Sequence, residues 1–246
     1  MGFYDSNKRQ RDQLVNEMIS NIIEDIAGHS LTYVLPYASD PDTYIRKQTY
    51  MILGRRYREN PQERKRIRET IEQLFASPDE KARQTAVYVL GEIGEVDEDF
   101  LVRAMKDPHH AVRNGVIGTL KTLGVKQPQA TLAFADKHIH DGDPEIRRQI
   151  IHGIELYGRT HPQDVLPLLR EVQNDPNRRV REMLIHVISQ ISYKKGCLQV
   201  IAAELKTWQN QALVEKCLQA ILDQHARQSY CAFTLDEAKE IIVELL

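Results

Sequence analysis

The sequence predicts an all-α protein, built as a solenoid of about six helical hairpins between two capping helices. Three observations predict this fold: a motif that recurs about every 34 residues, apolar residues spaced three and four apart within each copy, and few turn residues. Gly and Pro together make up 22 of the 246 residues, or about 9%. This share is below the roughly 12% of an average chain. Few residues therefore remain for the tight turns of a many-stranded β fold.

The recurring motif contains a basic residue followed by an apolar stretch. The aligned position is occupied in turn by Arg46, Arg83, Arg113, Arg147, Arg181 and, in a weaker sixth copy, Glu215. The steps between these positions are 37, 30, 34, 34 and 34 residues. Near-equal steps of this length are typical of stacked repeats rather than of a globular core.

Each copy is expected to form a helix. In the second copy Ala82, Ala86, Leu90 and Ile93 lie three or four residues apart, which is helix periodicity. Asp or Ser followed by Pro is typical of a helix N-cap and first turn. These dipeptides are Asp40-Pro41, Ser77-Pro78, Asp107-Pro108, Asp143-Pro144 and Asp175-Pro176. Glycines eleven residues after the repeat Arg are expected to end the helices in a left-handed conformation, and they are Gly94, Gly124 and Gly158.

A second helix fits between successive copies. The candidate segments are Pro61–Ala76, Glu98–Lys106, Gln127–His140, Pro162–Gln173 and Gly196–Trp208. One hairpin cannot cover its own apolar face, so it must stack on its neighbours. We therefore expect a single domain over residues 1–246, with an N-terminal capping helix within 1–30, repeats over 31–227 and a C-terminal capping helix within 228–246.

The repeat phase resembles that of HEAT repeats. The resemblance is clearest in DPHHAVRNGVIGTLKTLG from Asp107 and in DEKARQTAVYVLGEIG from Asp79, and it covers about Asp40–Arg227. It implies a right-handed α-solenoid in which the repeat Asp and Arg form a ladder between adjacent units. Ser77 and Gln209 replace the Asp in two copies, so we expect the ladder to be interrupted there.

Solenoids bind partners on their concave face, which is formed by one helix of each pair. On the Arg-bearing helices, positions one, five, eight and twelve after the Arg are expected to share an exposed stripe. The stripe is polar and contains rings, which suits a protein or peptide partner. The candidate partner-binding residues are Tyr88, Arg148, His152, Glu155, Arg159, His186 and Tyr193. His152 and His186 are 34 residues apart and should be neighbours. They are expected to be either two solvated side chains or a pH-sensitive or ligand-contacting pair beside Glu155.

Charge is concentrated in one early segment. The net charge of the chain is −2, which excludes a uniformly basic surface. Residues 46–68, however, contain nine Lys and Arg and two acids. Such a segment is either a solvated face with ordinary ion pairs or a phosphate-binding surface. The candidate nucleic-acid-binding residues are Arg55, Arg56, Arg58, Arg64, Lys65, Arg66 and Arg68.

The HEAT-like resemblance extends to two groups of enzymes. HEAT-like alkylpurine DNA glycosylases are solenoids of similar size that cradle DNA, and they use Trp around a catalytic Asp. Only one Trp is present here, Trp208, and Gln209 follows it. The bilin lyases with HEAT-like repeats are the other group. We find no phosphate-binding glycine loop and no nucleophile elbow.

The sequence thus favours a non-enzymatic scaffold that binds a protein or peptide. DNA binding is the alternative, and an enzyme resembling the lyases is a third. We expect no cofactor and no metal site. The run Asp136, His138, His140, Asp141 and Asp143 has metal-ligand residue types, but His138 and His140 would point apart on a helix. A site is possible there only if the helix has already ended.

Cysteines and hydropathy bear on location. Cys197, Cys217 and Cys231 are an odd number without metal-type spacing, and they are typical of a reducing compartment. The cytoplasm is the expected location. No apolar run approaches the roughly 18–20 residues that span a bilayer, so no membrane partner is expected. The oligomeric state is left open.

Overall fold

The computed structural model describes residues 3–245, and all regular structure within them is helical. The packing of Cα atoms divides the chain into two compact units, Met1–Thr122 (unit 1) and Leu123–Leu246 (unit 2). The boundary lies within one helix, α7 (His110–Lys126). The all-α, repeat-built fold class is confirmed. The expectation of a single domain stays a prediction.

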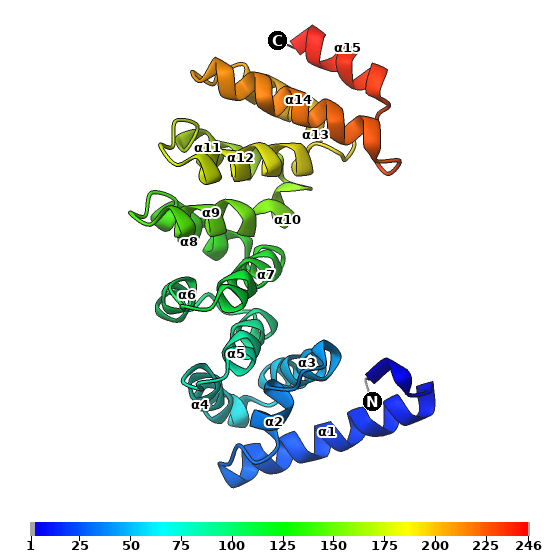
Figure 1. Cartoon of the computed structure of the whole chain (residues 1–246), viewed down its shortest axis with the longest axis vertical. Coiled ribbons are helices and arrows are strands. Elements are labelled where there is room, and N and C mark those ends of the chain that lie inside the picture. The colour runs from blue at the N-terminus through cyan, green and yellow to red at the C-terminus, as the bar shows by residue number, and fades with distance from the viewer. Residues whose placement is uncertain (1–2, 246) are drawn as a thin grey trace. The chain divides into compact units, whose positions relative to one another are not determined.

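Unit 1 contains two layers of helices. One layer carries the repeat Arg residues and consists of α3 (Thr43–Glu59), α5 (Glu80–Ile93) and the start of α7. The other consists of α4 (Arg64–Phe75, after the 3₁₀ turn Pro61–Glu63) and α6 (Glu98–Met105). The N-terminal helix α1 (Lys8–Gly28) packs on α3 and on the short α2 (Val34–Ala38), as Figure 1 illustrates. The 3₁₀ turn Phe3–Asp5 precedes α1.

Unit 2 repeats the same arrangement. Its Arg-bearing layer consists of α9 (Pro144–Gly153), the short α10 (Glu155–Gly158), α12 (Arg178–Ile191) and α14 (Gln211–Arg227). Its other layer consists of α8 (Pro128–His138), α11 (Pro162–Glu171) and α13 (Cys197–Leu205). The C-terminal helix α15 (Leu235–Leu245) packs on α13 and α14. Leu246, which the sequence assigns to the capping helix, lies outside the described residues.

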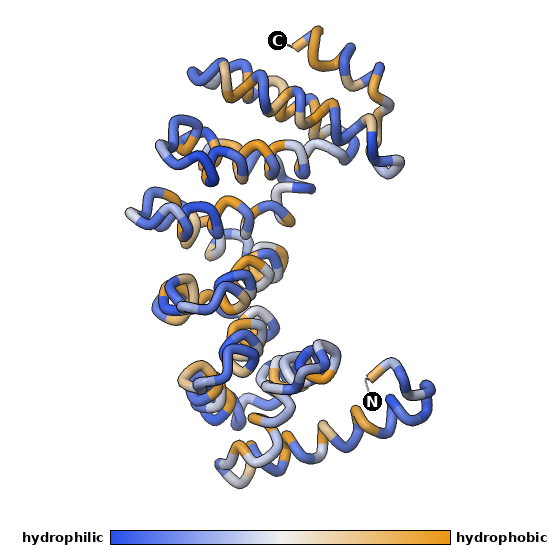
Figure 2. Tube along the Cα trace, in the orientation of Figure 1, coloured by the Kyte–Doolittle hydropathy of each residue, from blue (hydrophilic) through white to orange (hydrophobic). Residues whose placement is uncertain are grey.

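Hydrophobic and polar residues alternate along the helices (Figure 2). Each helix therefore has one apolar face, which is buried between the two layers. Val87 and Leu90 of α5, and Val187 and Ile188 of α12, are almost completely buried. All five predicted intervening helices are present, and each differs from its predicted bounds by at most three residues. No described helix is long and apolar enough to cross a bilayer.

The predicted ladder joins neighbouring copies within each unit. Arg83 donates from Nε to Asp107 at 2.8 Å, and Arg147 donates in the same way to Asp175 at 2.6 Å. Both Asp side chains are 4% exposed. The pKa of Asp107 is lowered: burial alone would raise it, but the bond from Arg83 and the backbone N–H of His109 outweigh burial. Each of these ion pairs is one rung of the ladder, and each rung therefore places an ionised carboxylate inside the stack.

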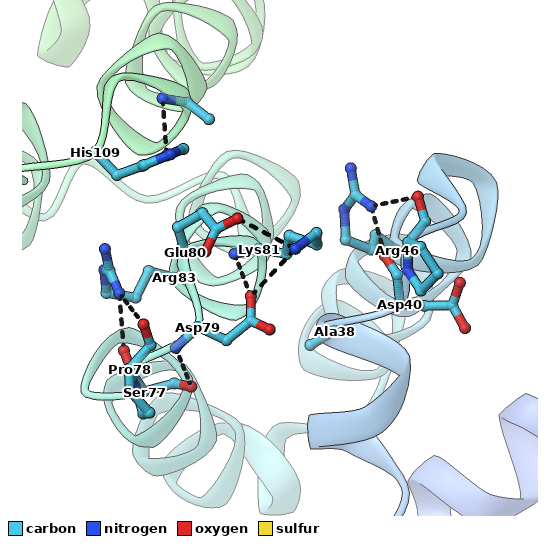
Figure 3. A network of polar contacts seen from close by, with 12 residues as sticks. Ala38, Asp40, Arg46, Ser77, Pro78, Asp79, Glu80, Lys81, Arg83 and His109 are labelled. Atoms are coloured by element: carbon cyan, nitrogen blue, oxygen red, sulfur yellow. Dashed lines mark hydrogen bonds and ion pairs between the residues drawn. The ribbon is translucent and has the colours of Figure 1, made fainter.

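The ladder is interrupted where Ser77 and Gln209 replace Asp, as predicted. Arg46, which would face Ser77, donates to its own turn at the carbonyl oxygens of Asp40 and Pro41 (Figure 3). Between the fifth and sixth copies, hydrogen bonds between neutral amides replace the ion pair. The side-chain oxygen of Gln173 accepts from the backbone N–H of Gln209 at 2.7 Å and from that of Asn210 at 3.0 Å.

The predicted helix starts are wrong by two residues in most copies. The N-caps are Asp42, Asp79 and Asn177, so the expected start is correct only at Asp143. The preceding Asp or Ser instead accepts a hydrogen bond from the N–H two residues on, as Ser77 does from Asp79. This extra turn, an Asx or ST turn, lies before the helix. Figure 3 shows Arg83 bonded to the carbonyl oxygens of this turn.

The predicted glycine C-caps are confirmed at one position. Gly94 ends α5 in a left-handed conformation with φ of 80°. Gly124 lies inside α7, and Gly158 is the last residue of α10, without a positive φ. A Cβ on Gly158 would lie 2.8 Å from Val165 and 3.1 Å from Ile191. That glycine is explained by close packing rather than by a turn.

Candidate partner-binding surface

The predicted stripe is exposed at position five of the Arg-bearing helices. Met51 of α3 and His186 of α12 are exposed, while Tyr88 of α5 and His152 of α9 are half-buried. A Cβ on Gly118, the same position in α7, would lie 3.1 Å from the Tyr88 ring. Neighbouring copies therefore touch at this position, as the register of the repeat requires.

Position eight of the stripe is buried in four of the six copies, contrary to the prediction, and is half-buried at Lys121 and Asp223. It is occupied by Gly54, Gly91 and Ser189 in three copies, where neighbouring helices approach closely. A Cβ on Gly54 would lie 2.3 Å from Cβ of Glu92, and one on Gly91 would lie 3.3 Å from the Thr119 backbone. Small residues at this position allow the helices of one layer to pack.

Glu155 occupies this same buried position in α10. Its side chain is 1% exposed, and both Nε and Nη2 of Arg159 donate to its Oε1 atom, Nε at 2.9 Å. Its Oε2 atom lies 3.2 Å from Nε2 of His152. The fourth copy thus buries a carboxylate at the position that holds Lys121 in the third copy and Ser189 in the fifth.

His152 and His186 are neighbours, as their spacing predicted. Their rings meet edge to face with centroids 5.7 Å apart, and the Nδ1 atom of His152 is buried without a hydrogen-bond partner among the described residues. Arg159 also lies over the ring of Tyr193, with Cζ 5.8 Å from the ring centroid. Five of the seven candidate partner-binding residues therefore form one contiguous group in unit 2.

The other two candidates form contacts of their own. Arg148 forms a two-bond ion pair with Glu145, at 3.0 and 2.6 Å, and its side chain is only 15% exposed. Tyr88 belongs to unit 1, where its ring packs on Tyr50 at 5.2 Å. Burial raises the pKa of the Tyr88 hydroxyl, so this ring is neutral at physiological pH.

Several exposed apolar side chains on or beside this layer are not among the candidate residues predicted from the sequence. Tyr44 begins α3 with 42% of its surface exposed, and Tyr4 packs across it with centroids 4.2 Å apart. Met51 lies two turns further along α3 and is 43% exposed. In unit 2, Tyr230 is 57% exposed and contacts Tyr193. Tyr4 and Tyr230 lie outside the repeat register, so periodicity could not have found them.

The basic cluster of residues 55–68 is largely paired with acids. Arg56 pairs with Glu63, Arg58 with Glu92, Arg66 with Glu69, and Arg68 with Glu95 and Asp97. Arg64 lies over the Tyr57 ring and donates to its carbonyl oxygen. In the described chain only Arg55 and Lys65 of the seven candidates are exposed without such a partner. The local positive field is therefore weaker than the sequence count implies.

A hollow of about 590 Å³ lies in unit 1 beside this cluster. Its apolar lining includes Ile71, Leu90 and Phe100. Its charged lining consists of two basic residues and three acids: Lys65, Arg68, Glu69, Glu72 and Asp97. Two of the candidate nucleic-acid-binding residues thus border an apolar hollow.

The run of acids and histidines at residues 136–143 does not assemble into a site. His138 ends α8 and packs against Phe134 with its ring tilted by 45°, whereas His140 lies beyond the helix and pairs with Glu171 at 2.7 Å. Of the described residues, only His152, Glu155 and His186 bring three ligand atoms close enough to share a metal ion.

Comparison with known proteins identifies the repeat and the fold. A family model described as HEAT repeats matches residues 67–138. AlkD2 from Streptococcus mutans is similar in structure, with a TM-score of 0.60 at 16% identity, over 80% of this chain and 97% of that one. The smu.31 protein of Streptococcus mutans UA159 has a TM-score of 0.50 at 17% identity, over 83% of this chain and 96% of that one. No curated protein sequence matches the chain. At these identities the likeness establishes the fold alone.

Proposed function

We propose that this chain, whose fold is that of HEAT-like repeats, is a non-enzymatic scaffold that binds a protein or peptide on its Arg-bearing layers. The observation that carries the proposal is the exposure of Tyr44 and Met51 on α3, next to Tyr4. Tyr, Met and Arg are enriched in the cores of protein interfaces. Side chains that project from a rigid helix layer lose little entropy when a partner binds.

Unit 2 supports the same role through different chemistry. Arg178 and Arg179 of α12 have side chains 84% and 74% exposed. They lie on the helix that carries His186. Both units therefore present mixed polar and aromatic faces on the Arg-bearing layer. A peptide backbone and its side chains find donors, charges and rings on such faces.

The test compares two glutamate substitutions on opposite layers of unit 1. Met51→Glu adds an acid to the exposed face of α3, and Gln73→Glu adds one to the exposed face of α4. Each protein is used to capture partners from the source cell, and each captured protein is quantified and then titrated in purified form. We expect Met51→Glu to weaken binding of the purified partner at least tenfold and Gln73→Glu to leave it unchanged. Equal affinity of the two variants and the parent would refute the assignment of this face.

DNA binding is the second candidate. Arg55, Arg64 and Lys65 favour it, because they are exposed and form no ion pair among the described residues. Duplex affinity that falls steeply with salt, and that Arg55→Glu reduces, is the expected signature. Absence of duplex binding at low salt would eliminate this candidate.

A further inference from the structure

We propose that His152, Glu155 and His186 form a zinc site between α9, α10 and α12 of unit 2. One nitrogen or oxygen atom of each side chain lies within 4.8 Å of the others. Bonds of 2.0–2.1 Å in a tetrahedral zinc site place its ligand atoms about 3.3 Å apart. Nε2 of His152 and Oε2 of Glu155 are already 3.2 Å apart. A small rotation of the exposed His186 ring closes the third side.

The donor set fits zinc. Two imidazoles and one carboxylate are a set that binds this ion in proteins and leaves a fourth position for water. His186 is exposed, so an ion can enter from solvent. The site does not depend on the proposed partner binding, because all three ligands belong to this chain.

Glu155 is already oriented as a ligand. Both hydrogen bonds from the Arg159 guanidinium go to its Oε1 atom, and its Oε2 atom lies 3.2 Å from Nε2 of His152. Outer partners of this kind fix a carboxylate for one-oxygen coordination. Arg159 also balances the carboxylate charge, so the two imidazoles supply most of the affinity. We therefore expect a dissociation constant on the order of micromolar rather than nanomolar.

The internal comparison of the repeats supports a specific role for this carboxylate. The same position holds the buried Gly54, Gly91 and Ser189 in three other copies, and the half-buried Lys121 and Asp223 in the remaining two. Glu155 is the one fully buried charged residue at this position. A buried carboxylate costs free energy unless it is paired. Arg159 meets this requirement at Oε1, and a zinc ion would add a second positive charge at Oε2.

The experiment uses the purified, metal-free protein and zinc chloride in competition with a chromophoric chelator. The parent should bind one zinc ion per chain, and His186→Gln should weaken binding at least tenfold. His140→Gln is the matched control, because it removes a different exposed histidine that also lies beside a carboxylate, Glu171. This control should bind zinc as the parent does.

Two outcomes would overturn the proposal: equal zinc affinity of the parent and His186→Gln, or the same loss in His140→Gln. X-ray absorption of the zinc complex gives an independent readout, with two imidazoles expected in the first shell. Thermal unfolding of the metal-free proteins verifies that each variant is folded. Because His186 is exposed, its replacement should leave the melting temperature of the metal-free protein unchanged. A partner that is lost in Met51→Glu while zinc binding persists separates this site from the proposed function.

Discussion

Replacement of Asp107 by Ala removes one rung of the ladder and measures what that rung contributes. Asp107 accepts two hydrogen bonds from Arg83, at 2.8 and 3.1 Å, and one from the backbone N–H of His109 at 2.8 Å. Charge-assisted bonds contribute about 1.5 kcal/mol each, and the turn bond contributes about 1 kcal/mol. The expected loss in the free energy of unfolding is therefore about 4 kcal/mol.

Asp40 provides the matched control within the same unit. It accepts the equivalent turn bond, from the N–H of Asp42 at 2.7 Å, but it lies in the first copy and has no preceding repeat Arg. Asp40→Ala should therefore cost only about 1 kcal/mol. The difference of about 3 kcal/mol belongs to the rung. With a slope of about 2 kcal/mol per molar urea, the two midpoints should differ by roughly 1.5 M.

The assay is urea unfolding followed by circular dichroism at the helix band. If the chain unfolds in two steps, the step that belongs to unit 1 is compared, because a single free energy is defined only for a two-state transition. A midpoint for Asp107→Ala equal to that of Asp40→Ala would refute the conclusion that the rung stabilises the stack.

Three further predictions concern pH, thiol chemistry and close packing. The pKa of Asp107 is lowered below its ordinary 3.8, so the ion pair stabilises the fold fully at neutral pH, and this stabilisation is lost as the pH falls through the folded-state pKa. The difference in free energy of unfolding between the parent and Asp107→Ala should therefore be smaller at pH 3 than at pH 7. A difference that is the same at both pH values would contradict this prediction. Burial raises the pKa of Cys217 to about 12, so a thiol reagent at pH 8 should leave it unmodified in the native protein while it labels the partly exposed Cys231. Gly54→Ala should destabilise the protein by about 1–3 kcal/mol, because its Cβ would meet that of Glu92, whereas Gly28→Ala meets nothing within 4 Å and should be neutral or slightly stabilising in the same urea assay.

The repeat register could be predicted from the sequence because it depends on local periodicity. The equal steps between Arg113, Arg147 and Arg181 located the helices, and the substitutions at Ser77 and Gln209 located the interruptions in the ladder. Both inferences needed only residue type and spacing. The ion pairs and the interruptions seen within each unit agree with them.

The details that were missed depend on contacts between segments far apart in sequence. A helical projection places Glu155 on the stripe, but it does not say which side of the stripe meets the next helix. The acids that neutralise Arg58 and Arg68 lie 27–34 residues away, on the end of α5 and in the loop after it. Most repeat helices begin two residues later than predicted, because Asp-Pro is found in turns before a helix as readily as at the helix N-cap.

The amide contacts of Gln173 with Gln209 and Asn210 differ in kind from the two arginine rungs. No formal charge is involved, so neither acid nor high ionic strength weakens them. Disassembly of unit 2 in acid should therefore have an order, in which the joint between the Arg147 and Arg181 copies loosens first. The hairpin formed by α13 and α14 should remain attached to the preceding hairpin as the last ordered piece.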